Sequence, residues 1–226
     1  MNYRKEKQPP RRERQSAERS AMGERRKRRS ILVVTNGKKT EPNYFNAFKT
    51  LLPKGTLESF IVEFHEGNQK QVVERAIAKN EEAEYHEVWA VLDVEAPDPD
   101  SNSFPTALAL AKNNSGVKVD YSNRQIEVWF LFHFPQGREI DQSMQGCKTI
   151  EKLNECLFST GIQEGYKKSH SVFNVLLHHG EEPAAINHAE EILKKARAKF
   201  PNEEWRYNPS TTVHHLVKRL REMIEP

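Results

Sequence analysis

Two nearly continuous apolar runs, residues 31–35 and 88–92, dominate the pattern of hydrophobic and polar positions along the chain. Runs of this kind are typical of strands that are buried on both faces of a parallel sheet. Two further runs, residues 60–64 and 117–121, are interpreted as additional strands. We therefore expect a parallel sheet with helices on both of its faces.

The segments between these strands carry apolar residues at helical spacing. Pro42 fits the first turn of a helix that reaches about Leu52. Two more helices are predicted, one over residues 69–84 and one around residues 107–111. Strands that alternate with helices through short connections favour right-handed βαβ units. The predicted fold class is therefore α/β.

The pattern changes after Ser122. An apolar run over residues 126–134 is too short to distinguish a helix from a strand, and its type stays open. Glu127 lies inside this run, so its carboxylate must be paired, protonated or bound to metal. The alternative is that it faces an arginine such as Arg124. Three further helices are predicted at about 146–158, 183–200 and 211–224.

Polar residues follow the two longest apolar runs, at the strand ends where open α/β sheets place their ligands. The first run leads into residues 36–41, and the second leads into Asp93 and Glu95. Two carboxylates in this arrangement lie close together but face different directions, which suits a divalent cation. The alternative is that they only begin a turn, because the Pro- and Asp-rich segment 96–100 follows.

The net charge of +3 hides an uneven distribution. Residues 1–29 hold twelve Lys or Arg and four Glu, a charge of +8, so the remaining chain carries −5. This arm has almost no large apolar residue and is expected to be disordered alone. Its densest block is expected to contact nucleic-acid phosphates and consists of Arg25, Arg26, Lys27, Arg28 and Arg29. The alternative is a tail that aids solubility or docks on an acidic partner.

The expected organisation has three parts: the arm over residues 1–29, an α/β core over 30–135, and a helical C-terminal extension over 136–226 that packs on the core. No apolar stretch approaches the length of a transmembrane helix, and the N-terminal segment lacks the apolar part of a signal peptide. Cys147 and Cys156 are therefore expected to be reduced, buried thiols of a cytoplasmic protein. No Cys/His spacing matches a structural zinc site, and the pairs His178-His179 and His214-His215 are expected on the surface.

Several motifs occur in order along residues 30–224. They are Gly37-Lys38-Lys39-Thr40-Glu41-Pro42-Asn43-Tyr44-Phe45, then Val88-Trp89 leading to Asp93, then Tyr121-Ser122-Asn123 before Glu127-Val128-Trp129-Phe130-Leu131-Phe132-His133-Phe134, and finally Asn208-Pro209-Ser210-Thr211-Thr212-Val213-His214. Together they resemble the RloB-like family, which in turn resembles a divergent topoisomerase-primase (Toprim) domain. The resemblance implies a Toprim-like parallel sheet flanked by helices, a place in bacterial or phage-associated restriction and abortive-infection loci, an ATPase partner, and Mg²⁺-dependent phosphodiester cleavage of DNA or RNA.

One position departs from the pattern that the resemblance implies. The family has Glu-Gly-x-x-Thr-Glu after the first strand, whereas this chain has Asn36 in place of the leading glutamate. An amide cannot take a proton near neutral pH, so Asn36 cannot act as the general acid or base expected there. Glu41 is the candidate substitute. The remaining family positions are matched by Gly37, Thr40, Glu41, Asp93, Asn123 and Glu127, while Glu95 replaces an aspartate.

The enzyme hypothesis assigns Asp93 and Glu95 to hold Mg²⁺ or Mn²⁺ and includes Asn36, Glu41 and Glu127 among the catalytic candidates. Lys38 and Lys39 would steady phosphate charge at the same sheet edge, or would only belong to a solvated loop. The Gly-Lys-Lys-Thr sequence lacks the upstream glycine of a nucleoside-triphosphate-binding loop, with Leu32 in its place, so that function is rejected.

Three functions therefore stay open. The first is a phage-defence-associated nuclease of the RloB/Toprim type that acts with an ATPase partner. The second is a catalytically weakened homologue that binds nucleic acid, which Asn36 favours. The third is an interaction subunit whose arm docks on an acidic partner without nucleic acid.

Overall fold

The computed structural model describes residues 30–56, 59–83, 85–94, 102–114, 116–141, 146–168 and 172–224. The predicted arm over residues 1–29, with its basic block, and the predicted ligand Glu95 lie outside these residues. The strands are β1 (Ser30–Thr35), β2 (Ser59–Phe64), β3 (Glu87–Val94), β4 (Val117–Asn123) and β5 (Ser210–Thr211). The helices are α2 (Thr40–Ala47), α3 (Gln69–Ala83), α4 (Ser103–Asn113), α5 (Glu127–Phe132), α6 (Pro135–Arg138), α7 (Cys147–Ser159), α8 (Phe173–His179), α9 (Glu182–Lys199) and α10 (His214–Ile224), with 3₁₀ turns η1 (Phe48–Thr50) and η2 (Glu204–Arg206).

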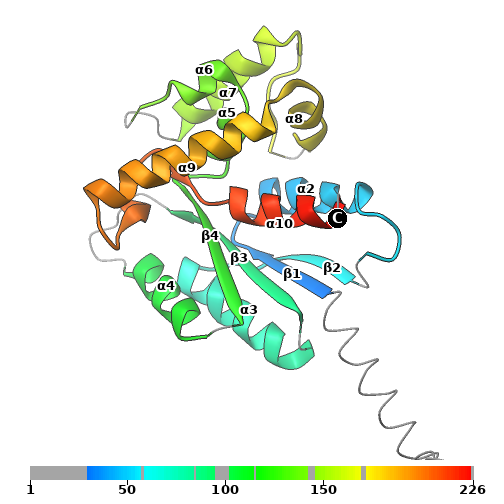
Figure 1. Cartoon of the computed structure of the whole chain (residues 1–226), viewed down its shortest axis with the longest axis vertical. Coiled ribbons are helices and arrows are strands. Elements are labelled where there is room, and N and C mark those ends of the chain that lie inside the picture. Colours follow the sequence, from blue (N-terminus) through cyan, green and yellow to red (C-terminus); the bar gives the residue numbers. More distant parts are fainter. Residues whose placement is uncertain are drawn as a thin grey trace, which may run out of the picture.

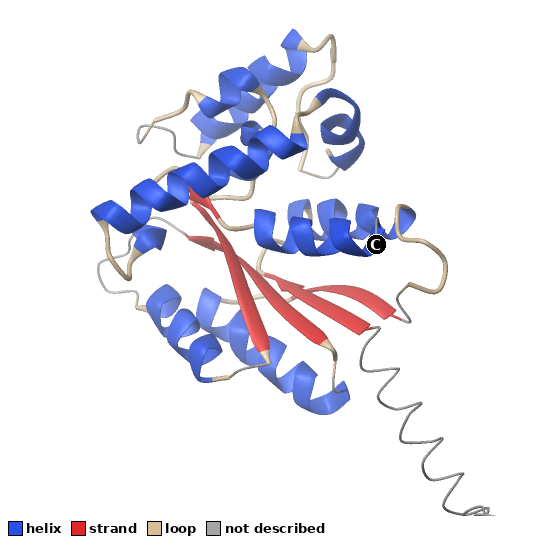
Figure 2. Ribbon diagram, in the orientation of Figure 1, coloured by secondary structure: helices blue, strands red, loops and turns tan. Residues whose placement is uncertain are grey.

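The five strands form one sheet in the order β2-β1-β3-β4-β5 (Figures 1 and 2). The first four strands are parallel, and β5 pairs antiparallel with the end of β4. Helices α3 and α4 cover one face of the sheet, while α2 and α10 cover the other (Figure 1). The predicted α/β fold with a parallel sheet between helices is confirmed.

The alternation of side chains along β1 shows why the apolar run is continuous. Ile31 and Val33 pack into a core beneath α2 and α10, whereas Leu32 and Val34 pack into a second core beneath α3 and α4. All four side chains have no exposed surface. A strand that is buried on both faces needs apolar residues at every position, which is the pattern seen in the sequence.

The run over residues 126–134, left open by the sequence, is helical at α5, and its six residues are all buried. Helices α5 to α8 form a group beyond α9, on the side of the sheet that carries α2 and α10 (Figure 1). The helix predicted to begin at residue 211 begins instead at His214, because Ser210 and Thr211 pair with β4. Cys156 is buried as expected, but the expectation for Cys147 is wrong because it is exposed.

The segment before α10 is fixed to β4 by buried polar contacts. Thr212 accepts a hydrogen bond from the Tyr121 backbone N–H through its hydroxyl and donates its own N–H to the Tyr121 carbonyl, both over 2.8 Å. The buried carboxylate of Asp120 accepts the Leu216 backbone N–H over 3.0 Å and lies 3.1 Å from the Nδ1 atom of His215. These contacts place α10 over the sheet.

A buried hydrogen bond joins α2 to α5 and yields a stability prediction. The Trp129 indole donates to the Tyr44 hydroxyl over 2.8 Å, and both side chains are buried. Tyr44→Phe should lower the free energy of unfolding by about 1–3 kcal/mol, because the indole N–H loses its acceptor in an apolar core. Urea denaturation measures the change. Tyr85→Phe, at a partly buried tyrosine of the other core, is the control and should cost clearly less; equal losses would contradict the prediction.

Candidate functional site

The order in which successive strands join the sheet reverses after β2, although the strands themselves stay parallel. The connection from β1 leads outward to β2, and the next connection returns past β1 to β3. In open α/β sheets, a crevice forms outside the carboxyl ends of the strands at such a reversal. The segments after β1 and β3 therefore meet at one edge of the sheet, as the sequence predicted.

Asn36 ties the ends of β1 and β3 together. Its side-chain oxygen accepts the backbone N–H of Asp93 over 2.9 Å. Gln69 also holds Asp93, because its side-chain N–H donates to the Asp93 carbonyl over 3.0 Å, and its side-chain oxygen in turn accepts the Ser103 hydroxyl over 2.6 Å. Asn36 thus positions Asp93, and it is not among the residues that line the adjoining pocket.

Glu41 lies in the first turn of α2 and is buried. Its carboxylate covers Gly37, so that a Cβ atom at Gly37 would overlap it. Burial, followed by the negative charge of Glu127, raises the pKa of Glu41 to about 7, although the backbone N–H groups of Glu41 and Gly37 donate to the carboxylate. Glu41 therefore exchanges its proton near neutral pH, unlike an ordinary glutamate.

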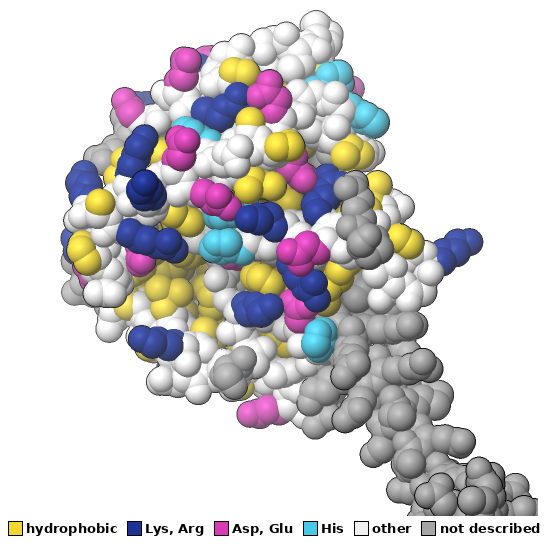
Figure 3. All heavy atoms as spheres, in the orientation of Figure 1, with side chains coloured by type: hydrophobic (Ala, Val, Ile, Leu, Met, Phe, Trp, Pro, Cys, Tyr) yellow, Lys and Arg dark blue, Asp and Glu magenta, His cyan; other side chains and the backbone are white. Residues whose placement is uncertain are grey.

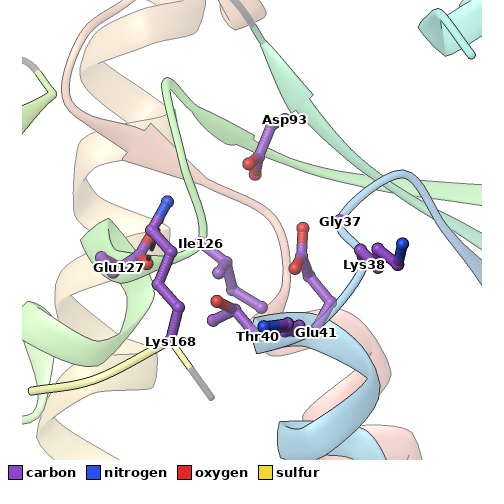
Figure 4. Close-up of a pocket in the computed structure, with 9 residues that line it drawn as sticks. Gly37, Lys38, Thr40, Glu41, Asp93, Ile126, Glu127 and Lys168 are labelled. Carbon is purple, nitrogen blue, oxygen red and sulfur yellow. Dashed lines mark ion pairs between the residues drawn. The ribbon is translucent and has the colours of Figure 1, made fainter. Parts of the chain in front are cut away.

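Asp93 is half-buried at the end of β3. Burial, together with the charges of Glu41 and Glu127, raises its pKa well above the usual value, while Lys168 and the Ile126 backbone N–H act in the opposite direction. Figure 4 shows the carboxylates of Asp93 and Glu41 facing one another across the pocket. The two predicted acids therefore act as one electrostatic unit.

Glu127, at the start of α5, is buried with only 1% of its surface exposed. The Tyr166 hydroxyl donates to its Oε1 atom over 2.8 Å and lies 3.3 Å from the Thr40 hydroxyl. The Lys168 ammonium is 4.0 Å from the same carboxylate. Glu127 is thus paired with Tyr166 and Lys168 rather than with the arginine considered from the sequence.

These residues enclose a pocket of about 230 Å³ (Figure 4). Its lining comes from four separate parts of the chain and consists of Gly37, Lys38, Lys39, Thr40, Glu41, Asp93, Ile126, Glu127 and Lys168. Lys38 and Lys39 are exposed at the pocket, and in Figure 4 the Lys38 side chain extends away from Asp93. The structure thus brings together Lys38, Lys39, Glu41, Asp93 and Glu127, which the sequence predicted.

Tyr166 and Lys168 were missed by the sequence analysis. Both belong to an irregular segment after α7, and no periodicity or motif connects that segment to the strand ends. The backbone N–H of Tyr166 donates to the Asn154 side chain over 2.6 Å, which fixes the segment to α7. Only information about which residues lie close together in space would have assigned Tyr166 and Lys168 to the pocket.

The pocket offers oxygen ligands for a divalent cation. Within the described part of the chain, no three His, Cys, Asp or Glu side chains are arranged so that they could hold a metal ion by themselves. This is compatible with Mg²⁺, which is usually bound by one or two carboxylates together with water and substrate phosphates. Of the two predicted metal ligands, Asp93 lies among the described residues. Glu95 lies outside them, so its role stays a prediction.

Comparison with known proteins identifies the family. The sequence model of the RloB-like protein family matches residues 31–220. The chain belongs to the RloB-like family. No curated protein and no solved structure matches it. Among the described residues of this RloB-like protein, no helix combines the length and the apolar character needed to cross a membrane.

The raised pKa of Glu41 predicts a pH-dependent stability. Because the folded state holds this proton more tightly than the unfolded chain, the stabilisation is present below about pH 4.5 and is lost as the pH rises through about 7. Glu41→Gln should therefore stabilise the metal-free protein at pH 8, by up to about 3 kcal/mol, and have little effect at pH 4.5.

Urea denaturation in EDTA at the two pH values measures this difference. Glu66→Gln is the matched control, because Glu66 is an exposed acid at the same sheet edge, outside the pocket. It should change stability at neither pH. A loss of stability in Glu41→Gln at pH 8 would contradict the electrostatic account of the pocket.

Proposed function

We propose that the pocket cleaves phosphodiester bonds of RNA or DNA in a divalent-metal-dependent reaction, as a phage-defence-associated nuclease of the RloB/Toprim type. One observation carries this proposal: Glu41, Asp93 and Glu127 come from three separate segments and surround one pocket at the reversal of the sheet. A pocket that offers one or two carboxylates as metal ligands, beside exposed lysines, suits a metal-dependent reaction on a polyanion.

The clustered carboxylates of the pocket favour the binding of a cation. Burial and mutual repulsion raise the pKa values of Glu41 and Asp93, so their ionised forms lack sufficient positive charge nearby. A divalent cation would stabilise these ionised forms. When bound, Mg²⁺ or Mn²⁺ would supply Lewis-acid stabilisation of the charge that develops on the phosphate. Asp93 and Glu95 are the residues that would hold it.

Glu41 is the residue suited to move a proton. A carboxyl with a pKa of about 7 is present in both protonation states near neutral pH, which is the condition for efficient general acid–base catalysis. Asn36 cannot take this role because it is an amide and its oxygen is engaged by the Asp93 backbone. Lys38, Lys39 and Lys168 would neutralise phosphate oxygens at the pocket.

Nuclease activity on mixed RNA and DNA with Mg²⁺ or Mn²⁺ tests the proposal. Asp93→Asn should reduce the cleavage rate to background, and Glu41→Gln should reduce it about 10²–10⁴-fold, because a positioned general base contributes that much. Because Glu41→Gln is expected to stabilise the fold, unfolding would not account for its inactivity. Glu66→Gln should cleave at the wild-type rate. Wild-type rates in Asp93→Asn would remove the pocket from the reaction.

Asn36 supports a second candidate, a catalytically weakened homologue that binds nucleic acid with slow turnover. The amide occupies the position at which the family has its leading acid. The proposal includes the basic arm as an additional phosphate-binding segment. An ATPase partner, expected from the resemblance, stays a prediction.

Restoring an acid distinguishes the two candidates. Asn36→Asp keeps an acceptor for the Asp93 N–H and adds a carboxylate beside the pocket, so the weakened homologue should gain cleavage rate by about tenfold or more. Initial rates with a labelled oligonucleotide measure the gain. Asn36→Ala, which has neither the acceptor nor the carboxylate, is the control. An unchanged rate in Asn36→Asp, with activity abolished in Glu41→Gln, would identify Glu41 as the working base and contradict the weakened form.

A further inference from the structure

The charges of α9 are segregated along its length. Residues 181–191 contain four glutamates and no Lys or Arg. The second half of the helix and the turn after it contain five bases and two acids. We call these five bases the α9 patch: Lys194, Lys195, Arg197, Lys199 and Arg206, all of them exposed. Figure 3 shows Lys and Arg side chains gathered over this end of α9.

Two partly exposed aromatic rings lie among the bases of the α9 patch. The rings of Phe200 and Tyr207 contact each other with centroids 6.5 Å apart. The Lys199 ammonium lies 5.4 Å from the Phe200 ring centre and 5.7 Å from that of Tyr207. The Arg206 guanidinium lies 5.3 Å from the Phe200 ring centre. Two cations thus lie beside one aromatic ring at the surface.

A structural role explains only part of this cluster. Bases in the last turn of a helix are stabilised by the helix dipole, which accounts for Arg197 and Lys199. Arg206, which lies beyond the helix, forms an ion pair with Glu203 over 2.8 Å, and Arg197 lies 3.5 Å from Glu204. Tyr207 packs partly against the core beneath α2 and α10. These contacts leave Lys194 and Lys195 and the partly exposed faces of the two rings without a structural explanation. Aromatic faces beside mobile cations are the features by which proteins bind single-stranded nucleic acid without sequence preference.

The α9 patch lies at the same sheet edge as the pocket. Asn123, the last residue of β4, donates its side-chain N–H to the Trp205 carbonyl over 2.6 Å, which attaches η2 to the end of that strand. The neighbouring strand ends in Asp93, which pairs in register with Ser122. A nucleic acid bound along η2 and α9 would therefore lead toward the pocket.

We propose that the α9 patch, with the rings of Phe200 and Tyr207, binds the single-stranded part of a nucleic acid whose adjoining phosphate reaches the pocket. The inference rests on the proposed function in taking nucleic acid as the ligand, and it adds the substrate class. Unpaired bases can stack on the two rings, whereas the bases of a duplex are already stacked and paired. The cations would move from the rings to the phosphates.

Binding measured in EDTA separates this inference from catalysis. Fluorescence anisotropy would record the affinity of the full-length protein for labelled single-stranded and duplex oligonucleotides of RNA and DNA at two salt concentrations. Lys199→Glu combined with Arg206→Glu should weaken single-strand binding tenfold or more and reduce the salt dependence. Phe200→Leu combined with Tyr207→Leu, which keeps apolar volume, should weaken single-strand binding at least fivefold and leave duplex binding unchanged.

Lys79→Glu is the control and should leave both affinities unchanged. Lys79 lies in the second half of α3, which leads to the amino end of β3, whereas the α9 patch lies at the carboxyl ends of the strands. The arm is present in every variant, so differences among the variants report on the substituted residues. Equal losses for duplex and single strand in the leucine variant would overturn the single-strand assignment. Unchanged affinities in the charge variant would overturn the inference and favour an acidic protein partner. Because binding is measured without a divalent metal and no cleavage is required, a pocket that proves inactive would not affect this result.

Discussion

The burial of a parallel sheet on both faces is the constraint from which the rest of this structure follows. Parallel strands require crossovers, and right-handed crossovers place a helix on one face or the other according to the direction in which the sheet grows. Growth outward from β1 to β2 and then back to β3 puts α2 and α3 on opposite faces. The same reversal leaves room at the ends of β1 and β3, where the acids of the pocket lie. The position of the pocket therefore follows from the strand order that lets helices cover both faces of the sheet.

The buried carboxylates of the pocket destabilise the folded state. Burial of Glu41 near Asp93 and Glu127 costs free energy that the two apolar cores must offset. The arrangement is also sterically restricted, because only glycine at position 37 leaves space for the Glu41 carboxylate. A side chain at that position would displace the acid from the pocket. Such locally unfavourable arrangements persist where function requires them, and they are supported by the surrounding structure.

The sequence predicted the parts of the fold and the site that depend on local pattern. Continuous apolar runs located β1 and β3, and the polar residues after them located Glu41 and Asp93. The helical character of α5 could not be decided, because a short run that is buried on all sides has no periodicity. The adjacent pair His214-His215 could not be placed correctly from the sequence either. His215 is 47% exposed, but the surface expectation for His214 is wrong, because adjacent residues on a helix face different directions and the His214 side chain, at the start of α10, is buried. Tyr166 and Lys168 reach the pocket through tertiary packing alone, which local pattern does not encode.

The contacts between Asp120 and the start of α10 have a consequence for synthesis on the ribosome. The sheet edge at β4 and the face beneath α10 can be completed only after residues 210–220 have emerged, although the strands themselves are made much earlier. Domains fold as units during synthesis, and an incomplete one exposes apolar surface. Lys168, which lies beside Glu127, also follows the first four strands along the chain. A nascent chain would therefore complete the pocket only after residue 168 has emerged, well after the strands that carry its acids.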